Sequence, residues 1–215
     1  GLHGVQLTAS HNPASYNGVK FCLPGAAPVT PEMLSDIKAL ALSDTPLDPV
    51  AEPGSRREQD VLADYADYLH SLVNLDGLRR LTVVVDAGNG MAGHTAPAVL
   101  EPLNIELIGL FMDLDGSFPN HPPNPLEPAN LLDAQRAVRE RGADLGLVFD
   151  GDADRCFIID ERGEVVSPSI ATALIAVQEL GRKPGGSVVV NTITSEAVAD
   201  AVAAAGGRVH VSKVG

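Results

Sequence analysis

Short runs of apolar residues alternate along the chain with stretches in which apolar side chains recur at helical spacing. The runs at Leu81–Asp86, Ile105–Leu110, Leu145–Phe149 and Ser187–Asn191 have the length and aliphatic content of buried strands. Residues 57–73 instead carry their apolar side chains on one helical stripe. Strands that alternate with helices are typical of α/β proteins, so we predict an α/β fold.

Capping and turn signals predict the other elements. Thr30 followed by Pro31 marks a helix start, after which apolar side chains recur at helical spacing. Asn130 is predicted to cap a helix over residues 131–141, which Gly142 ends. The same rules predict strands at 5–8, 19–23, 156–160 and 208–212, and helices at 92–103, 168–180 and 195–205.

Two proline-rich stretches interrupt this pattern. Residues 44–55 hold three prolines and little periodicity, so we interpret them as a linker between domains. The order of strands and helices restarts after this linker and again after residues 150–155. Residues 111–129 form a long segment with five prolines, and unstructured segments of this length are usually functional loops or disordered.

The composition narrows the function classes. Hydrophobic residues make up 45% of the 215 residues, which is enough to bury a core. The formal net charge of −13 argues against nucleic-acid and anionic-membrane partners, because both need a basic surface. Apolar runs stay below the roughly 18 residues that a membrane span requires. Cys22 and Cys156 are predicted to be free thiols, which fits a cytoplasmic protein.

Residues 150–155 read D-G-D-A-D-R and follow a predicted buried strand. They place Asp150, Asp152 and Asp154 two residues apart on a tight loop, where mutual repulsion favours a bound cation. Carboxylate oxygens are hard ligands that prefer Mg²⁺, Mn²⁺ or Ca²⁺ over Zn²⁺. The plain alternative is an acidic surface turn, but the two flanking apolar strands argue against it.

Two other metal-dependent classes of protein share part of this loop pattern. An EF-hand needs glycine at its sixth position, where this chain has Arg155, and needs helices on both sides instead of strands. A phosphatase of the haloacid-dehalogenase type also places D-x-D after an apolar strand, with the first Asp as nucleophile. That class expects glycine and then Thr or Val after the second Asp, whereas Ala153 and Asp154 stand here. The phosphatase remains an alternative.

A second candidate is the segment at residues 8–13, which reads T-A-S-H-N-P and is followed by Y-N-G-V-K at residues 16–20. Ser10 is a weak nucleophile at neutral pH unless a base, a metal or an attached phosphate activates it. Lys20 offers a point charge suited to phosphate. A hydroxyl-capped turn with a structural histidine would also explain the local pattern.

Residues 88–93 match G-x-G-x-x-G after a predicted strand, which alone suggests dinucleotide binding. Asp86 would place negative charge beside the pyrophosphate, and Pro97 lies early in the helix that should hold it. We therefore interpret this segment as a glycine-rich turn.

Taken together, T-A-S-H-N-P with Y-N-G-x-K and the distant D-G-D-x-D-R resemble the α-D-phosphohexomutase family. Residues 86–90, 118–122 and 125–131 resemble further segments of that family. The last two are closer to its phosphomannomutase/phosphoglucomutase branch. The resemblance extends over essentially all 215 residues.

The resemblance implies repeated α/β domains with mixed sheets flanked by helices. Residues 1–55 would be the C-terminal part of domain 1, 56–162 domain 2, and 163–215 the N-terminal part of domain 3. The chain is then expected to be an incomplete portion of the enzyme that turns over little by itself.

The resemblance also implies a phosphoserine mechanism. Ser10 would carry a phosphoryl group and transfer it to a hexose monophosphate, giving a hexose 1,6-bisphosphate that returns its other phosphate to Ser10. Mg²⁺ would be held by Asp150, Asp152, Asp154 and an oxygen of the Ser10 phosphate. The expected partner is a hexose phosphate in the cytoplasm, with no nucleic acid and no membrane. A non-catalytic module derived from a mutase is a further alternative.

The remaining site residues follow from the same resemblance. Arg155 and Lys20 would face the transferring phosphoryl group. His11 and Asn12 would shape the serine loop or assist proton transfer. Lys213 resembles the start of a sugar-binding loop.

Overall fold

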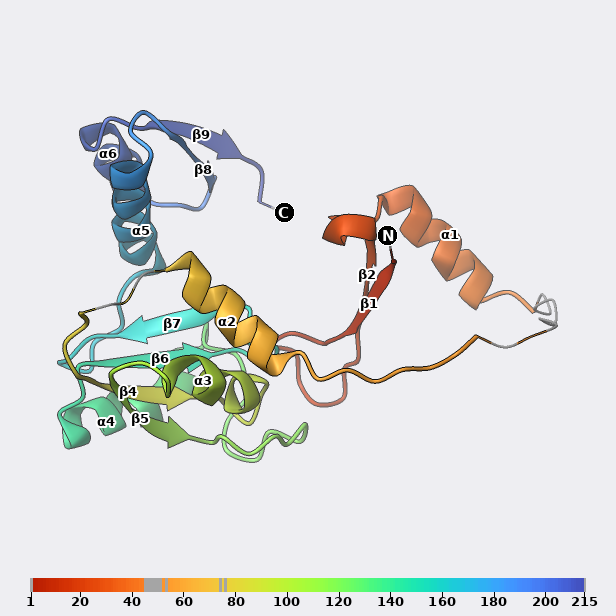
Figure 1. The fold of residues 1–215 in the computed structure, drawn as a ribbon, viewed down its shortest axis with the longest axis horizontal. Helices are drawn as coiled ribbons and strands as arrows, with labels where there is room; N and C mark the ends of the chain where they lie inside the picture. The colour runs from red at the N-terminus through yellow and green to blue at the C-terminus, as the bar shows by residue number, and fades with distance from the viewer. Residues whose placement is uncertain (1, 45–51, 53, 74, 76, 215) are drawn as a thin grey trace.

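The computed structural model describes residues 2–44, 52, 54–73, 75 and 77–214. Most of the predicted linker at 44–55 lies outside the described residues. Figure 1 shows three groups of elements: a small N-terminal sheet with α1, a central sheet with three helices, and a C-terminal pair of strands with two helices. The predicted α/β class with mixed sheets is confirmed.

The N-terminal sheet is antiparallel and carries the serine segment. Strand β1 (Gly4–Leu7) pairs with β2 (Val19–Leu23), and β2 pairs with the short β3 (Ala27–Pro28). Leu7 lies opposite Val19, so residues 8–18 form the connection between the two strands. Helix α1 (Pro31–Ala41) starts as predicted, with the Thr30 hydroxyl accepting the N–H of Met33.

The central sheet has the order β5-β4-β6-β7. Strands β4 (Leu81–Asp86), β5 (Ile105–Leu110) and β6 (Leu145–Phe149) are parallel, and β7 (Cys156–Ile159) runs antiparallel to β6. The carboxyl ends of β4 and β6 therefore lie at one edge of the sheet, where ligand sites of open α/β sheets usually form.

Helices cover both faces of this sheet, because successive side chains of β4 point to opposite sides. Val84 packs in one buried cluster with residues of α4 (Leu132–Arg141). Val83 and Val85 pack in a second cluster with Ala96 of α3 (Ala92–Leu100). Helix α2 (Leu62–Leu72) lies against α3.

The C-terminal group contains helix α5 (Pro168–Arg182), strand β8 (Ser187–Asn191), helix α6 (Glu196–Ala204) and strand β9 (Arg208–Ser212). The two strands are parallel, and a small core of Ala176, Leu180, Val198 and Val202 joins the helices. Among the described residues, no helix combines the length and apolar character needed to cross a bilayer.

Two sequence predictions about helix starts are wrong. Helix α2 begins at Leu62 instead of 57, because the Asp60 carboxylate accepts the N–H of Leu62 and ends the extended approach there. Asn130 does not cap α4: it lies inside the 3-10 turn Pro128–Leu131, where its side chain donates to the carbonyl of Asn124. The predicted end of α4 is confirmed, since Gly142 adopts the left-handed conformation with φ 60°.

Candidate active site

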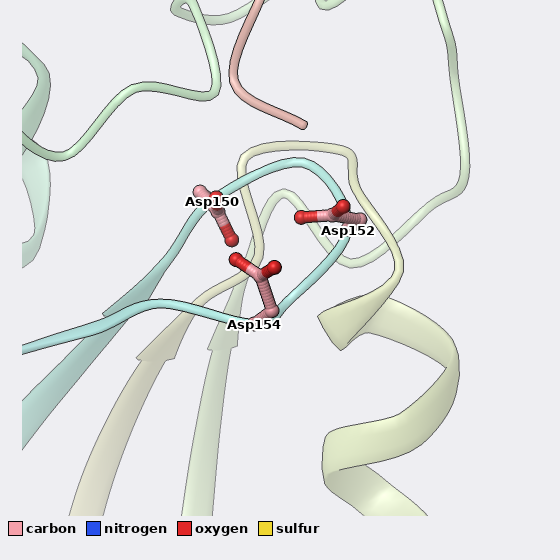
Figure 2. Close-up of side chains that lie close together, drawn as sticks. All are labelled: Asp150, Asp152 and Asp154. Atoms are coloured by element: carbon pink, nitrogen blue, oxygen red, sulfur yellow. The ribbon is translucent and has the colours of Figure 1, made fainter. Parts of the chain in front are cut away.

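The three aspartates lie in the connection between β6 and β7, at the carboxyl edge of the central sheet. Figure 2 shows their carboxylates turned toward one another, and one oxygen from each lies within 4.8 Å of the others. The loop is closed by Asp150, whose amide donates to the carbonyl of Arg155 and whose Oδ1 accepts the N–H of Arg155. Ala153 completes the turn in the left-handed conformation, with φ 60°.

The electrostatics of this loop favour a cation. Asp150 is completely buried, and burial together with the charges of Asp152 and Asp154 raises its pKa. Oδ1 of Asp152 is buried and accepts no hydrogen bond from the described residues. A buried acceptor without a donor is costly unless something else binds it. The donor set is oxygen only, so the site fits a hard divalent ion such as Mg²⁺.

The serine loop reaches these carboxylates although 140 residues separate it from Asp150. Ser10 Oγ lies 3.4 Å from Oδ2 of Asp150 and 3.2 Å from Nδ1 of His11. Ser10 adopts the left-handed conformation, with φ 55°, which is uncommon for a residue with a side chain. Asn12 closes the turn that contains Ser10, since its amide N–H and its side chain both donate to the carbonyl of Ala9.

Thr8 joins the two loops and was missed as a site residue in the sequence. Its hydroxyl donates to Oδ2 of Asp152 over 2.6 Å and accepts the N–H of Ser10 over 2.8 Å. One hydroxyl therefore orients both the serine backbone and a carboxylate whose other oxygen accepts no hydrogen bond from the part of the chain that the structure describes. Its position two residues before Ser10 is the sole local signal, and such spacing is compatible with an ordinary hydroxyl-capped turn.

The two loops also touch through their backbones at Gly151. A Cβ added to Gly151 would lie 2.4 Å from the carbonyl oxygen of Ser10, so no side chain fits there. Gly18 meets the same limit, with a Cβ position 2.1 Å from the carbonyl oxygen of Thr8. Gly151 is needed for the close approach of the two loops, and Gly18 for the close packing of the two ends of the serine loop.

Both predicted cations border the acidic loop. Lys20 Nζ lies 3.9 Å from Asp152 and 3.8 Å from Asp154, and Arg155 Nε lies 3.7 Å from Asp150. Both side chains are partly exposed, so these pairs contribute little stability. Their charges remain open to an anionic group in the site. Arg155 also donates from Nη1 to Nδ1 of His11 over 2.7 Å.

Lys213 is not joined to this cluster. It follows β9 and is exposed, and no hydrogen bond or ion pair connects it to the acidic loop within the part of the chain that the structure describes. Its predicted role stays a prediction.

A cavity of about 810 Å³ opens beside Ser10 and Asp152. The serine loop forms one wall, and Tyr65, Met91 and Phe118 from the central unit form part of the other. Its size suits a small ligand, and it combines an apolar wall with convergent polar groups, as binding sites commonly do.

Two regions of the sequence match two domains of one known family. Residues 63–163 match Phosphoglucomutase/phosphomannomutase, alpha/beta/alpha domain II. Residues 2–47 match alpha/beta/alpha domain I of the same family.

Individual relatives agree with this match. The chain is 39% identical over 221 residues to a phosphomannomutase of Escherichia coli K12, an alignment that covers 99% of this chain and 48% of the relative. It is 37% identical over 215 residues to a phosphomannomutase/phosphoglucomutase of Pseudomonas putida, covering 100% of this chain and 45% of the relative. The chain thus spans about half the length of these relatives.

A solved structure supports the same grouping. The crystal structure of a phosphoglucomutase/phosphomannomutase family protein from Burkholderia thailandensis superposes with a TM-score of 0.88 at 34% identity. The superposition covers 99% of this chain and 45% of that structure.

Proposed function

The chain belongs to the phosphoglucomutase/phosphomannomutase family, and on this basis we propose that it forms part of an enzyme that interconverts hexose 1-phosphate and hexose 6-phosphate. The substrate would be mannose phosphate, glucose phosphate or both, with a phosphorylated Ser10 and a hexose 1,6-bisphosphate on the path. One observation carries the proposal: the Ser10 hydroxyl lies 3.4 Å from the buried carboxylate of Asp150. Asp150 belongs to the acidic loop at residues 150–155 (the metal loop), whose candidate ligand atoms are all oxygens.

The proposed transfer breaks the bond between phosphorus and Ser10 Oγ and forms a bond from phosphorus to a free hydroxyl oxygen of the hexose monophosphate. The sugar hydroxyl loses its proton as that bond forms and the departing Ser10 oxygen gains one, so the transfer is neutral in protons overall. The bisphosphate then returns its other phosphoryl group to Ser10 by the same steps in reverse. Such transfers depend mainly on positioning and charge neutralisation.

Asp150, Asp152 and Asp154 would hold Mg²⁺ together with an oxygen of the Ser10 phosphate. Bound there, Mg²⁺ would neutralise charge on the transferring phosphoryl group. Arg155 and Lys20 lie at the edge of the same loop, where they would contact the other phosphate oxygens.

Nδ1 of His11 accepts a hydrogen bond from Arg155. A guanidinium has no acceptor atom, so the contact from Arg155 requires Nδ1 of His11 to be unprotonated. The same nitrogen faces Ser10 Oγ at 3.2 Å. Because Arg155 already donates to this nitrogen and the Ser10 hydroxyl donates to Asp150, we propose that His11 shapes the serine loop or assists proton transfer at Ser10 Oγ, and that Asn12 holds the loop that presents both residues.

A phosphatase of the haloacid-dehalogenase type is less compatible with this geometry. Its nucleophile would be Asp150, whose side chain is completely buried and already accepts the N–H of Arg155. The family match does not favour it either. A non-catalytic module remains testable, because it would carry no phosphoserine.

The net charge of the chain also bears on the partners and the cellular location of the enzyme. A net charge of −13 argues against nucleic acid and an anionic membrane as partners, and it does not exclude a small anionic substrate held by Lys20 and Arg155. We accordingly propose a cytoplasmic enzyme that acts on free hexose phosphates.

The test is an assay of the intact protein for conversion of glucose 1-phosphate to glucose 6-phosphate, with catalytic glucose 1,6-bisphosphate and Mg²⁺. A matched run with mannose 1-phosphate sets the preference. Isomerised sugar supports the proposal, and release of free phosphate in its place would identify a phosphatase. Ser10→Ala should remove both turnover and acid-stable protein phosphate; phosphoserine that persists in this variant would refute Ser10 as the carrier.

A further inference from the structure

Two segments that the phosphoryl-transfer mechanism does not use meet behind the metal loop. Asp86 ends strand β4 and is completely buried, and His121 comes from the long proline-rich segment after β5. Nε2 of His121 lies 3.1 Å and 3.2 Å from the two carboxylate oxygens of Asp86. The His121 side chain is 9% exposed, so this pair is largely shielded from solvent.

The surroundings of His121 favour the imidazolium form. Nδ1 lies 2.9 Å from the carbonyl oxygen of Pro122, so both ring nitrogens face acceptors, and only imidazolium donates from both. Asp86 from β4 and Asp133 from α4 are the charged groups that act on the ring, and both raise the pKa of His121, against an opposing effect of burial. Phe111 packs against the ring edge-on, with centroids 5.3 Å apart.

A continuous set of contacts leads from this pair to the metal loop. Oδ1 of Asp86 accepts the N–H of Gly88, which fixes the start of the turn at 87–90. At the end of that turn, Met91 donates its N–H to the carbonyl of Gly151 over 3.0 Å. A Cβ on Gly90 would lie 2.7 Å from the same carbonyl oxygen, so the turn and the metal loop are in direct backbone contact.

The segment that carries His121 also lies close to the metal loop. Pro123 Cγ lies 3.5 Å from the position of a Cβ on Gly151. Asn120 donates to the side chain of Asn89 over 2.7 Å, which ties this segment to the turn a second time. Gly151 is thus held between the turn, the His121 segment and the carbonyl of Ser10.

We propose that Asp86 and His121 form a buried ion pair that positions the metal loop through Gly151. The pair touches neither metal nor substrate, so both are positioning residues and not catalytic ones. The inference rests on the proposed function, because it assigns the pair a role in the affinity of the loop for a divalent ion. A pair that served stability alone would leave the ion affinity of the folded protein unchanged.

The experiment is a Mn²⁺ titration of the intact protein, followed by electron paramagnetic resonance, for wild type, Asp86→Asn, His121→Gln and the double variant. We expect each single variant to bind Mn²⁺ about tenfold more weakly, in line with the effect of residues that orient metal ligands. The double variant should be no weaker than the weaker single variant, because each single change leaves one buried charge unpaired. His94→Gln, an exposed histidine of α3, is the matched control and should bind as wild type does.

Steady-state kinetics gives a second readout. The single variants should show a lower kcat with an unchanged KM for the hexose phosphate, because neither residue lines the cavity beside Ser10. A third measurement needs no variant: the ¹⁵N shifts of the His121 ring should show imidazolium at pH about 7, above the ordinary histidine pKa.

The outcomes separate the two proposals. If the wild type binds no Mn²⁺ and shows no mutase activity, the proposed function is refuted and the positioning role with it. If the wild type binds Mn²⁺ and the folded single variants bind it equally well, only the positioning role is refuted. Strictly additive losses in the double variant, or a neutral His121 ring in the wild type, would likewise overturn the ion pair.

Discussion

Replacing Thr8 by valine tests how the two loops of the site are coupled. Valine has nearly the shape of threonine and lacks its hydroxyl, so packing changes little. The change removes the 2.6 Å donor to Asp152 and the 2.8 Å acceptor for the Ser10 amide at once. The Asp152 side chain is only 8% exposed, so water replaces the lost donor poorly.

The size of the effect follows from these contacts. A hydrogen bond to a charged group contributes about 1.5–3 kcal/mol, and each 1.4 kcal/mol is about tenfold. We therefore expect Thr8→Val to lower kcat/KM for glucose 1-phosphate about tenfold to about a hundredfold and to weaken Mn²⁺ binding in the same direction. Thr8→Ser keeps the hydroxyl and should stay within about threefold of wild type.

The assay is the coupled mutase measurement with Mg²⁺ varied at saturating bisphosphate, beside the Mn²⁺ titration. Wild-type kinetics in Thr8→Val would refute the coupling role of the hydroxyl. A loss in Thr8→Ser as large as in Thr8→Val would show that the hydroxyl alone does not account for the coupling.

Three further changes probe other parts of the site. Asp152→Asn should raise the Mg²⁺ concentration for half-maximal activity at least about tenfold, since the loop loses a charged ligand; an unchanged Mg²⁺ response would reject the loop as the metal site. Gly151→Ala places a methyl group 2.4 Å from the Ser10 carbonyl and should lower the free energy of unfolding by about 2 kcal/mol in urea titrations, whereas Gly116→Ala meets nothing within 4 Å and should be neutral. The pKa of His121 is raised from 6.5, so its pairing stabilises the fold below that pH and the gain is lost as pH rises through the raised value; melting curves from about pH 5 to about pH 9 should show the gap between wild type and His121→Gln closing at high pH.

Much of the fold follows from local sequence. Strands β4, β5, β6, β8 and β9 have the predicted bounds: the first four are mainly apolar runs, and β9 alternates apolar and polar residues. The cap of α4 was predicted wrongly, although the helix starts at Leu132, one residue from the predicted start. Asn130, a good capping residue, instead donates to the carbonyl of Asn124, a contact that capping preferences do not describe.

The candidate site, like the fold, was predicted from the sequence only in part. Motif spacing predicted the aspartate loop and the serine loop, and their resemblance to one family predicted that they act together. The Thr8 hydroxyl and Asp152 lie 144 residues apart, and Asp86 and His121 lie 35 apart. Contacts between residues so far apart in the chain leave no periodic pattern in the local sequence. They form only when the folded sheet brings the loops at the ends of its strands together.

The left-handed backbone of Ser10 has an evolutionary consequence. Glycine would relieve that conformation, which costs a residue with a side chain about 1–2 kcal/mol. Ala153 in the metal loop adopts the same left-handed conformation, with φ 60°, and has a similar conformational cost. At position 10 the proposed phosphoryl carrier needs a side chain, so under that proposal selection for chemistry opposes selection for stability there. Position 153 needs no side chain for the proposed reaction. Replacing Ala153 by glycine could therefore increase stability during evolution without altering that reaction.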